Sequence, residues 1–381
     1  MMANVYYASA PDYSGETLTA ALQKAFLPVA AEVGGIAGKR VMIKPNFLEW
    51  KGSEIPVCVD PALLLELCRL LKEQGASAIA IIENPAVKSA PVIVEKMGIA
   101  SPLAELGVEV RNCAVYQFVD MPENSAFRRM EIACEYREFD LVIDFAKAKT
   151  HAMMTLTLAV KNLFGLIRGS ERLGWHLAVG RDFSRFADML LDIYLLVKPH
   201  ISIVDAVIAM EGNGPGSGTP VKLDFIACST DAVALDASVA SKLGVNDLLT
   251  VQRAAERGVF ENFTECGDVP EVKHITLPDP PQLSLEWGVY FPVKLRKYLR
   301  KYMVSRPKVD GKRCVGCGVC AQMCPPQSLK IVDGKPVFKL NDCIRCFCCQ
   351  EHCPVGAIVS EKTAFMRFAD KFEKFIRKIV R

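Results

Sequence analysis

The chain has 381 residues, of which 51% are hydrophobic and 23% are charged, and its formal net charge is +3. This balance is that of an ordinary globular protein with ample apolar material for a large core, and the length indicates two or three domains. A net charge so close to zero gives no general attraction to nucleic acid, so we expect no nucleic-acid partner.

The N-terminal residues 1–7 lead directly into a strand-like segment, without the charged and apolar regions of a secretory signal. The sequence also contains no uncharged apolar run of about eighteen residues, so no membrane-spanning helix is predicted. We therefore expect the protein in the cytoplasm. Six cysteines are scattered over the first 270 residues, and we interpret those that lie within apolar runs as small core residues.

Buried strands and amphipathic helices alternate over the first 275 residues. Residues 61–75 are typical of a helix, because proline begins the segment, apolar residues recur at helical spacing and glycine ends it. Further helices are predicted at about 183–197 and 231–243. The predicted strands are 40–44, 78–82, 141–144, 201–205 and 225–228. This alternation indicates an α/β domain over residues 1–277, with a mostly parallel sheet and helices on both faces.

Polar, charged and glycine residues follow four of the predicted strands. In sheets of this kind, ligands bind beyond the carboxyl ends of the strands. Strand 141–144 is followed by several cationic side chains, and strand 201–205 leads to the glycine-rich segment 211–218. We therefore expect substrate-binding side chains in the segments after the strands. The candidates are Lys44, Asn46, Lys147, Asn162, Glu211 and Asn213.

Cationic residues gather around two of these strand ends and predict a site for an anionic substrate, such as a carboxylate or phosphate. The alternative is a set of solvated surface lysines. The candidate catalytic residues are Lys149, His151 and Lys161. A reduction needs protons as well as electrons, and His151 could donate one. Lys149 is a rival donor if burial lowers its pKa, and a structural hydrogen bond is the alternative role for His151.

The segment 211–218 contains four glycines in eight residues. Successive backbone N–H groups in such a segment can form an anion-binding nest, and a plain turn is the alternative. The segment lacks the Lys-Ser/Thr pair of a P-loop, and no G-x-G-x-x-G follows the first strand. The sequence therefore supports neither nucleotide hydrolysis nor a Rossmann dinucleotide site.

Residues 278–306 are predicted to be a linker, first proline-rich and then basic. Beyond it, C-x2-C-x2-C-x3-C-P occurs twice, starting at Cys314 and again at Cys343. In this motif three thiolates reach one cubane and the fourth binds the other. Zinc is the alternative, but it usually takes two separated cysteine pairs. The predicted ligands of two [4Fe-4S] clusters are Cys314, Cys317, Cys320 and Cys353 for one, and Cys343, Cys346, Cys349 and Cys324 for the other.

Two further features complete the C-terminal part. Cys348 falls outside the ligand spacing, and we do not expect it to bind a cluster. Residues 361–381 are predicted to form a basic amphipathic helix, because Phe and Ile recur on one side and Lys and Arg on the other. This helix could pack against the rest of the protein or make a peripheral contact with an anionic membrane.

The motifs resemble two known families. Residues 307–360 resemble bacterial-type two-cluster ferredoxins, which implies a small ferredoxin-like α+β domain. Residues 38–257 resemble domain-of-unknown-function family 362, often fused to such a ferredoxin. The segments that carry this second resemblance are Lys44-Pro45-Asn46, Lys147-Ala148-Lys149-Thr150-His151, Val160-Lys161-Asn162-Leu163-Phe164-Gly165, Glu211-Gly212-Asn213-Gly214-Pro215 and Asp231-Ala232-Val233-Ala234-Leu235-Asp236. The family name implies no chemistry, so the reaction must be argued from the residues.

We therefore expect an iron–sulfur oxidoreductase. An electron-carrier protein such as ferredoxin or flavodoxin would supply electrons, which would pass through the two clusters to a small anionic substrate in the α/β domain. Two other classes of function fit the same motifs. The α/β domain could dock a partner protein in a non-catalytic electron-transfer adapter, or the chain could be a ligand-binding redox sensor.

Overall fold

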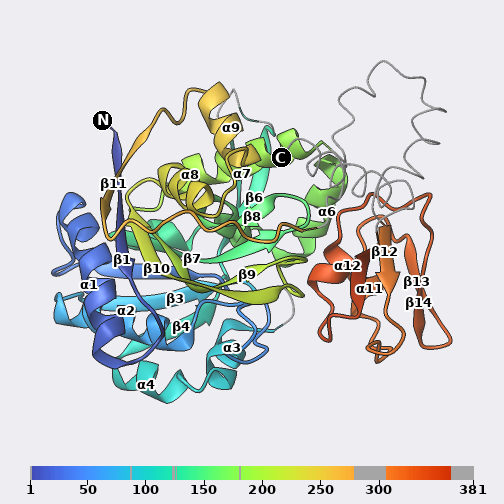
Figure 1. Cartoon of the computed structure of the whole chain (residues 1–381), viewed down its shortest axis with the longest axis horizontal. Helices are drawn as coiled ribbons and strands as arrows, with labels where there is room; N and C mark the ends of the chain where they lie inside the picture. Colours follow the sequence, from blue (N-terminus) through green and yellow to red (C-terminus); the bar gives the residue numbers. More distant parts are fainter. Residues whose placement is uncertain are drawn as a thin grey trace, which may run out of the picture.

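The computed structural model describes residues 2–278, except 86, 87, 122–124, 126, 180 and 181, and residues 306–361. A large α/β domain and a small C-terminal domain lie side by side (Figure 1). The predicted linker 278–306 and the predicted helix 361–381 fall outside the described residues, apart from 278, 306 and 361. In the described part, no helix is long and apolar enough to cross a membrane.

The large domain is built on one sheet, which has nine strands within the described residues, in the order β11-β1-β10-β9-β7-β2-β3-β4, with β8 paired to β7. The pairs β2–β3, β2–β7, β3–β4, β7–β9 and β1–β11 are parallel, whereas β10 runs antiparallel to β1 and β9. The predicted mostly parallel sheet is thus confirmed. The strands are β1 (Ala3–Ser9), β2 (Arg40–Pro45), β3 (Ala78–Glu83), β4 (Val108–Asn112), β7 (Leu141–His151), β8 (Thr155–Thr157), β9 (Ile201–Glu211), β10 (Thr219–Ser229) and β11 (Phe263–Gly267).

Helices cover both faces of the sheet, as predicted (Figure 1). Side chains of a strand alternate between its faces, and β2 shows the result. Val41 and Ile43 belong to the core under α1–α4, whereas Met42 belongs to the core under α5–α9. The helices are α1 (Gly15–Glu32), α2 (Pro61–Glu73), α3 (Ala90–Lys96), α4 (Ala100–Glu105), α5 (Ala159–Asn162), α6 (Gly169–Val179), α7 (Phe183–Val197), α8 (Ala232–Lys242) and α9 (Leu249–Glu256). Strands β5 (Tyr116–Asp120) and β6 (Arg129–Ala133) form a separate hairpin.

Aspartate residues cap the N-termini of three helices, and these caps explain why the helices begin close to the predicted residues. Asp60 accepts a hydrogen bond from Ala62 N at the start of α2, and Asp182 accepts one from Arg185 N at the start of α7. Asp231 accepts from two backbone N–H groups of α8. Such caps satisfy N–H groups that have no partner within the helix. Helix α7 spans the predicted residues 183–197, and α2 and α8 end within two residues of prediction.

Two central strands are longer than the sequence predicts. β7 extends to His151 and β9 extends to Glu211, so Lys147, Lys149 and His151 lie on a strand and not in a loop after it. β7 is paired with β2 on one side and β9 on the other, and β8 pairs with its last three residues. These lysines are therefore buried although they are cationic.

The small domain contains two short antiparallel pairs and two short helices. Strand β12 (Arg306–Val309) pairs with β15 (Ile358–Glu361), and β13 (Leu329–Val332) pairs with β14 (Lys335–Phe338). The helices are α11 (Val319–Gln322) and α12 (Cys348–Glu351). The β12–β15 pair places residues 306 and 361 inside this domain, so Glu361 ends a strand and does not begin the predicted helix.

The loop between β9 and β10 docks the small domain onto the large one. Lys51 Nζ donates hydrogen bonds to Gly216 O at 2.9 Å and to Cys353 O at 3.2 Å. Gln350 Nε2 donates to Asn213 O at 3.3 Å. A Cβ atom at Gly216 would lie only 2.5 Å from Glu351 O, so glycine is needed there for contact between the domains. Three of the four glycines of 211–218, namely Gly214, Gly216 and Gly218, thus allow close packing, and Gly212 allows a positive φ.

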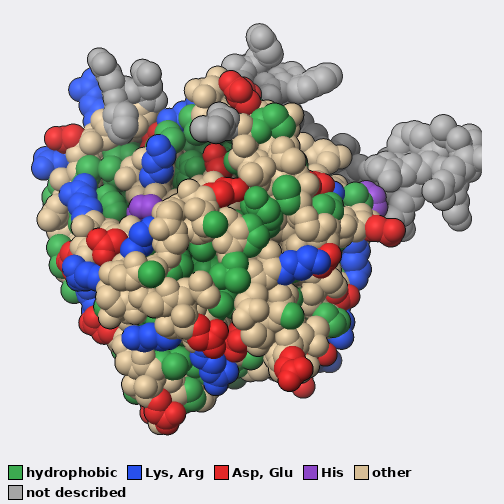
Figure 2. Space-filling model, turned by 90° about the vertical axis from the view of Figure 1, so that its left-hand side faces the viewer, with side chains coloured by type: hydrophobic (Ala, Val, Ile, Leu, Met, Phe, Trp, Pro, Cys, Tyr) green, Lys and Arg blue, Asp and Glu red, His purple; other side chains and the backbone are tan. Residues whose placement is uncertain are grey.

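One face of the large domain has no single sign of charge. On the face that Figure 2 turns toward the viewer, Lys and Arg side chains are mixed with Asp and Glu side chains. This mixture agrees with the low net charge of the sequence.

Candidate functional site

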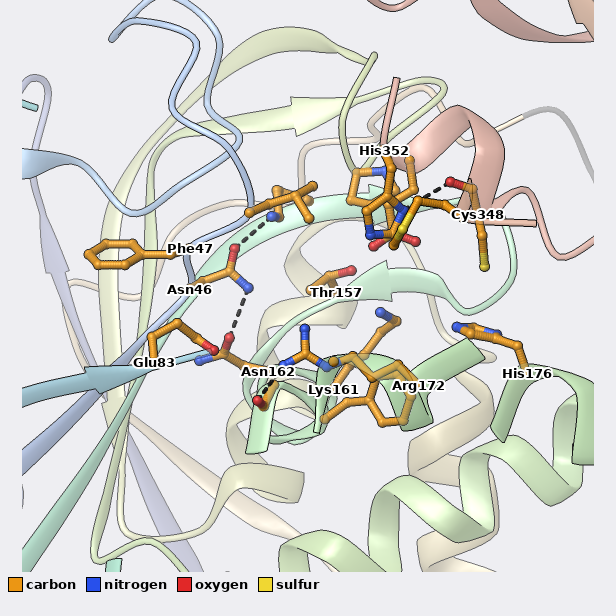
Figure 3. A pocket seen from close by; sticks show the side chains of 18 of the residues that line it. Asn46, Phe47, Glu83, Thr157, Lys161, Asn162, Arg172, His176, Cys348 and His352 are labelled. Atoms are coloured by element: carbon orange, nitrogen blue, oxygen red, sulfur yellow. Dashed lines mark hydrogen bonds between the residues drawn. The ribbon is translucent and has the colours of Figure 1, made fainter. Parts of the chain in front are cut away.

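A pocket lies between the two domains, at the carboxyl ends of β2 and β3. Its cavity volume is about 90 Å³, so it suits a small ligand. Figure 3 shows Cys348 and His352 of the small domain facing side chains of α5 and α6. The residues on which its chemistry depends are Lys44, Asn46, Lys149, Thr157, Lys161, Asn162, Arg172 and His176 from the large domain, and Met323, Cys348, Glu351 and His352 from the small one.

A chain of amide groups orients one lysine of the pocket. Asn162 Nδ2 donates to Asp144 Oδ1 at 2.7 Å, so Asn162 Oδ1 is left to accept from Asn46 Nδ2 at 2.8 Å. This fixes the amide of Asn46, and its Oδ1 accepts from Lys149 Nζ at 2.6 Å. Lys149 Nζ also donates to Val57 O at 2.6 Å. The predicted site residues Asn46, Asn162 and Lys149 therefore belong to one network (Figure 3).

Lys44, another predicted substrate-binding residue, is already paired. Its Nζ forms an ion pair with Glu83 at the end of the next strand, and both side chains are almost fully buried. A Cβ at Gly165 would lie within 2.7 Å of both charged groups, so glycine makes room for this pair. Lys44 lines the pocket, but its charge is neutralised, and it is not a free cation for an anionic substrate as the sequence predicts.

Three other cations line the pocket, and none forms an ion pair with a carboxylate among the described residues. Lys149 meets only neutral oxygens. Arg172 donates to the backbone oxygens of Ile167, Asn84 and Gly165. The side chain of Lys161 makes no hydrogen bond to any described residue, and burial lowers its pKa. Burial also lowers the pKa of Lys149 to about 7, so Lys161 and Arg172 are the cations that favour an anionic ligand.

The carboxylate of Glu351 enters this cationic site from the small domain. Burial alone would raise the pKa of Glu351, but the charges of His352 and Lys161 lower it to about 2. Its Oε2 lies 3.9 Å from His151 Nε2. Glu351 therefore stays ionised and offsets part of the positive charge, which ties the small domain electrostatically to the pocket.

Two buried polar atoms in the pocket wall lack a hydrogen-bond partner among the described residues. They are Thr157 Oγ1 and His176 Nδ1. Both side chains are more than nine-tenths buried, and burial lowers the pKa of His176 to about 4, so its ring is neutral. An unpaired buried polar atom is costly, and a ligand in the pocket would supply the missing partner.

Several predicted site residues lie outside the pocket. Lys147 is buried behind it and donates to Asp205 at 2.8 Å and to Tyr13 Oη at 2.6 Å. His151 Nδ1 accepts from two backbone N–H groups, those of Met153 and Met154, and burial holds the His151 pKa well below its usual range. The structure thus corrects the expectation that Lys147 binds substrate and that His151 donates a proton.

The two candidates from the glycine-rich segment 211–218, Glu211 and Asn213, also lie outside the pocket. Glu211 Oε2 accepts from Thr276 N, and the backbone oxygen of Asn213 accepts from Gln350 at the domain contact. Arg168 pairs with Glu131 at 2.8 Å outside the pocket. The positions of Glu211 and Asn213 follow from the length of β9, which ends only at Glu211.

Sequence reasoning missed several residues that line the pocket. Arg172 and His176 come from α6, four residues apart, so they lie on the same side of the helix. That spacing is the signal that could have revealed them. Thr157 lies directly opposite Lys149 in the β7–β8 pair. Glu351 lies between two predicted cluster ligands, and no sequence pattern indicates that it faces another domain.

The first set of predicted cluster ligands surrounds a hollow in the small domain. Cys314, Cys317, Cys320 and Cys353 all line it. Burial, followed by the neighbouring thiolates of Cys353, Cys317 and Cys314, raises the pKa of Cys320 to about 11. Among the described residues, no three His, Cys, Asp or Glu side chains are placed to hold a single metal ion. A cubane spreads its thiolates over different irons, and four thiols around one hollow fit that arrangement.

The second set lies close to the pocket. Burial, followed by Cys346, Cys343, Cys324 and Cys320, raises the pKa of Cys349, so all five cysteines lie near one another. Cys348 and Met323, the chain neighbours of Cys349 and Cys324, line the pocket itself. A cluster held by this set would lie next to the pocket, and the ligand assignment of both sets remains a prediction.

The fold and the cysteine sets define an α/β protein that carries an iron–sulfur dicluster domain. Residues 306–354 match the model of a 4Fe-4S dicluster domain. The chain belongs to the family described as domain of unknown function (DUF362), whose model matches residues 41–241.

Relatives and solved structures add little chemistry. A thylakoid-associated protein of Synechocystis is 28% identical over 265 residues, covering 69% of this chain and 82% of that protein. A polyferredoxin-like protein of Methanocaldococcus jannaschii is 28% identical over 89 residues, covering 19% of this chain and 52% of that protein. The lactate racemase apoprotein from Thermoanaerobacterium thermosaccharolyticum gives a TM-score of 0.41 at 12% identity, covering 61% of this chain and 57% of that chain. A score this low carries no argument about function.

Proposed function

We propose that the chain is an iron–sulfur oxidoreductase whose substrate is a small anion bound in the pocket between the domains. A carrier protein such as ferredoxin or flavodoxin would supply electrons to the small domain. The observation that carries the proposal is the composition of the pocket wall, because residues of a cluster-binding domain share it with Lys161 and Arg172, and neither cation forms an ion pair with a carboxylate within the described residues. Clusters held by the two cysteine sets would transfer electrons one at a time to a substrate in the pocket.

Residues of the pocket would bind the anion, donate protons and exclude water. Lys161 and Arg172 would bind the anionic group, because both are cationic and neither is neutralised by an ion pair within the described residues. Protons for the reduced substrate would come from Lys149 or Lys161, whose pKa values are lowered by burial. The docked small domain would exclude water from the pocket, which strengthens these electrostatic contacts.

The test uses the full chain, purified without oxygen and reduced with dithionite. We expect a small-molecule filtrate of cell extract to reoxidise the clusters, followed by their absorbance, and Lys161→Met to weaken this reaction. A hydrogen bond to a charged group contributes about 1.5–3 kcal/mol, so half-saturation should need roughly ten- to hundredfold more filtrate. The side chain of Lys161 makes no hydrogen bond to any described residue, so this variant should keep its fold.

Arg168→Gln is the matched control. It also removes one positive charge near α6, but Arg168 pairs with Glu131 outside the pocket, and reoxidation should stay unchanged. If only the protein fraction of the extract reoxidises the clusters, the α/β domain is the docking module of an electron-transfer adapter and the proposal is wrong.

A further inference from the structure

Two of the three buried lysines of β2 and β7 form ion pairs with carboxylates. Lys44 is paired with Glu83, and Lys147 lies 2.8 Å from Asp205. A carboxylate beside a buried ammonium stabilises its charged form and uses its nitrogen as a donor. Neither amine is available for chemistry with a ligand.

Lys149 has a different set of partners. Its side chain is 2% exposed, and its Nζ meets two neutral oxygens, Asn46 Oδ1 and Val57 O, each at 2.6 Å. An ammonium group has three N–H donors, whereas a neutral amine has two and a lone pair. Two acceptors therefore satisfy the neutral amine completely and leave the lone pair in the remaining direction. Lys149 lines the pocket, so the pocket is where that lone pair is available.

The groups around Lys149 suit attack on a carbonyl compound. Thr157 lies opposite Lys149 in the β7–β8 pair, and its unpaired Oγ1 can donate to the oxygen that becomes negative during attack. Lys161 and Arg172 line the same pocket and can hold an anionic group of the same molecule. A nucleophile, a hydroxyl donor and an anion site thus meet in one pocket.

We propose that Lys149 forms an imine with an aldehyde or ketone that also carries a carboxylate or phosphate group. This inference rests on the proposed function, because it names the substrate class of the same pocket. The amine nitrogen attacks the carbonyl carbon and a C–N bond forms. The carbonyl oxygen leaves as water, which takes both amine protons, so the step involves no oxidation or reduction.

The covalent link restricts which bond of the substrate is reduced. Reduction of the C=N bond itself would leave Lys149 as a secondary amine and end turnover. The reduced bond is therefore a C=C bond conjugated with the imine, which makes the substrate class an α,β-unsaturated aldehyde or ketone with an anionic group. Two electrons from the carrier protein and two protons saturate the C=C bond. Because Lys149 has given up its protons to form the imine, the protons come from Lys161 and from water. Water then adds to the C=N bond and releases the saturated carbonyl product and the free amine.

The charge environment supports a neutral amine. Burial, followed by the opposing effects of nearby charges, lowers the pKa of Lys149 to about 7. The groups that act on it are Cys58 before α2, Lys147 on its own strand, Lys161 on α5 and Glu351 on α12. About half of the amine is then neutral at pH 7, against roughly one in two thousand for an ordinary lysine.

The test is reductive labelling of the full chain with its clusters in place, using two probes. Glyoxylate is a small aldehyde with a carboxylate, and formaldehyde is smaller and uncharged. Each is added with cyanoborohydride, which reduces an imine to a stable amine, and modified lysines are located by peptide mass spectrometry. We expect both probes to label Lys149 at pH 7 at least about tenfold faster than exposed lysines, because its neutral fraction is larger. The rate should level off above pH 7, while that of exposed lysines keeps rising.

Lys147 is the internal control, because it is as buried as Lys149 but paired with Asp205, and it should stay unlabelled. Lys161→Met should lower glyoxylate labelling of Lys149 more than formaldehyde labelling, because only glyoxylate uses the anion site. Formaldehyde labelling of Lys149 no faster than that of exposed lysines would overturn the inference.

Formaldehyde labelling without a preference for glyoxylate would exclude the anionic substrate class. The proposed function is tested separately, because labelling needs no electron transfer. Reoxidation by the filtrate without labelling of Lys149 would support the oxidoreductase proposal and contradict the imine. Labelling without reoxidation would support the imine and contradict the oxidoreductase proposal.

Discussion

Asp144 is a buried carboxyl group beside the pocket, and its neighbours only partly offset the cost of burying its charge. Asp144 lies in the first half of β7, opposite Lys44 of β2. Its Oδ1 accepts from Asn162, while Oδ2 has no partner among the described residues. Burial raises the pKa of Asp144 to about 8, against the effect of Lys44, whose charge lowers it. The carboxyl group is thus protonated at neutral pH in the folded protein, and it begins the amide chain that orients Lys149.

Replacing Asp144 by Asn should change how stability depends on pH. An aspartate in the unfolded chain has a pKa near about 3.9, and the folded pKa is about 8. Between these values only the folded state holds the proton, so the free energy of unfolding falls as pH rises. Asn cannot ionise, and it keeps an oxygen to accept from Asn162. The free energy of unfolding of Asp144→Asn minus that of the parent chain should therefore be larger at pH 8 than at pH 5.

Urea unfolding at the two pH values measures this difference, and fluorescence of the large domain reports it. Since one pKa unit corresponds to about 1.4 kcal/mol, the change between pH 5 and 8 should be on the order of a few kcal/mol. An equal effect of the substitution at both pH values would show that Asp144 is ionised in the folded state, contrary to this account.

At the level of elements, the sequence predicts which segments are strands better than where they end. Apolar runs locate β2, β3, β7 and β9, because a central parallel strand needs apolar side chains on both faces. The end of β7 could not be predicted, because Lys147 and Lys149 break the apolar pattern. Their burial depends on Asp205 and Asn46, which come from distant parts of the chain. Long-range partners of this kind leave no local signal in a sequence.

The loop between β9 and β10 should tolerate no side chain at Gly216. A Cβ atom there would lie 2.5 Å from Glu351 O, a backbone atom that cannot turn aside. We expect Gly216→Ala to separate the loop from α12 at a cost of about 1–3 kcal/mol, the usual range for overpacking. Hydrogen exchange should become faster in residues 212–218 and 348–351, while cluster absorbance stays the same.

Gly311→Ala is the control for this substitution. Gly311 has open space around its Cα and belongs to the small domain, so an added methyl group should leave exchange unchanged. If Gly216→Ala leaves exchange in both segments as slow as in the parent chain, the loop does not hold the two domains together.

For the whole molecule, the sequence predicts the two parts and not their contact. The cysteine spacing predicts a dicluster domain, and the strand–helix alternation predicts the α/β domain, because both patterns are local. The pocket could not be predicted, because its wall combines Lys161 and Arg172 with Glu351 of the other domain. Five of the nine candidate residues line that wall, namely Lys44, Asn46, Lys149, Lys161 and Asn162, whereas Lys147, His151, Glu211 and Asn213 do not.

Lys51 of the large domain contacts the small domain at Cys353, a predicted cluster ligand. Its Nζ donates to Gly216 O and to Cys353 O, so a positive charge lies beside the backbone of one ligand of the first cysteine set. Reduction of a cluster adds negative charge, which a nearby cation and its hydrogen bonds favour. Lys51→Met should therefore make the reduction potential of the cluster at Cys353 more negative by tens of millivolts, and the other cluster should change less. A redox titration followed by electron paramagnetic resonance measures both.

Two further variants show whether this effect comes from the contact or from charge alone. Lys51→Arg keeps the charge and should keep most of the potential. Lys308→Met removes an equal charge from the small domain, but Lys308 is 60% exposed and pairs with Glu361, so solvent screens it. The two methionine variants should therefore differ, with the larger shift in Lys51→Met. Equal shifts would mean that the potential responds only to net charge, and that Lys51 does not couple the docking of the domains to electron transfer.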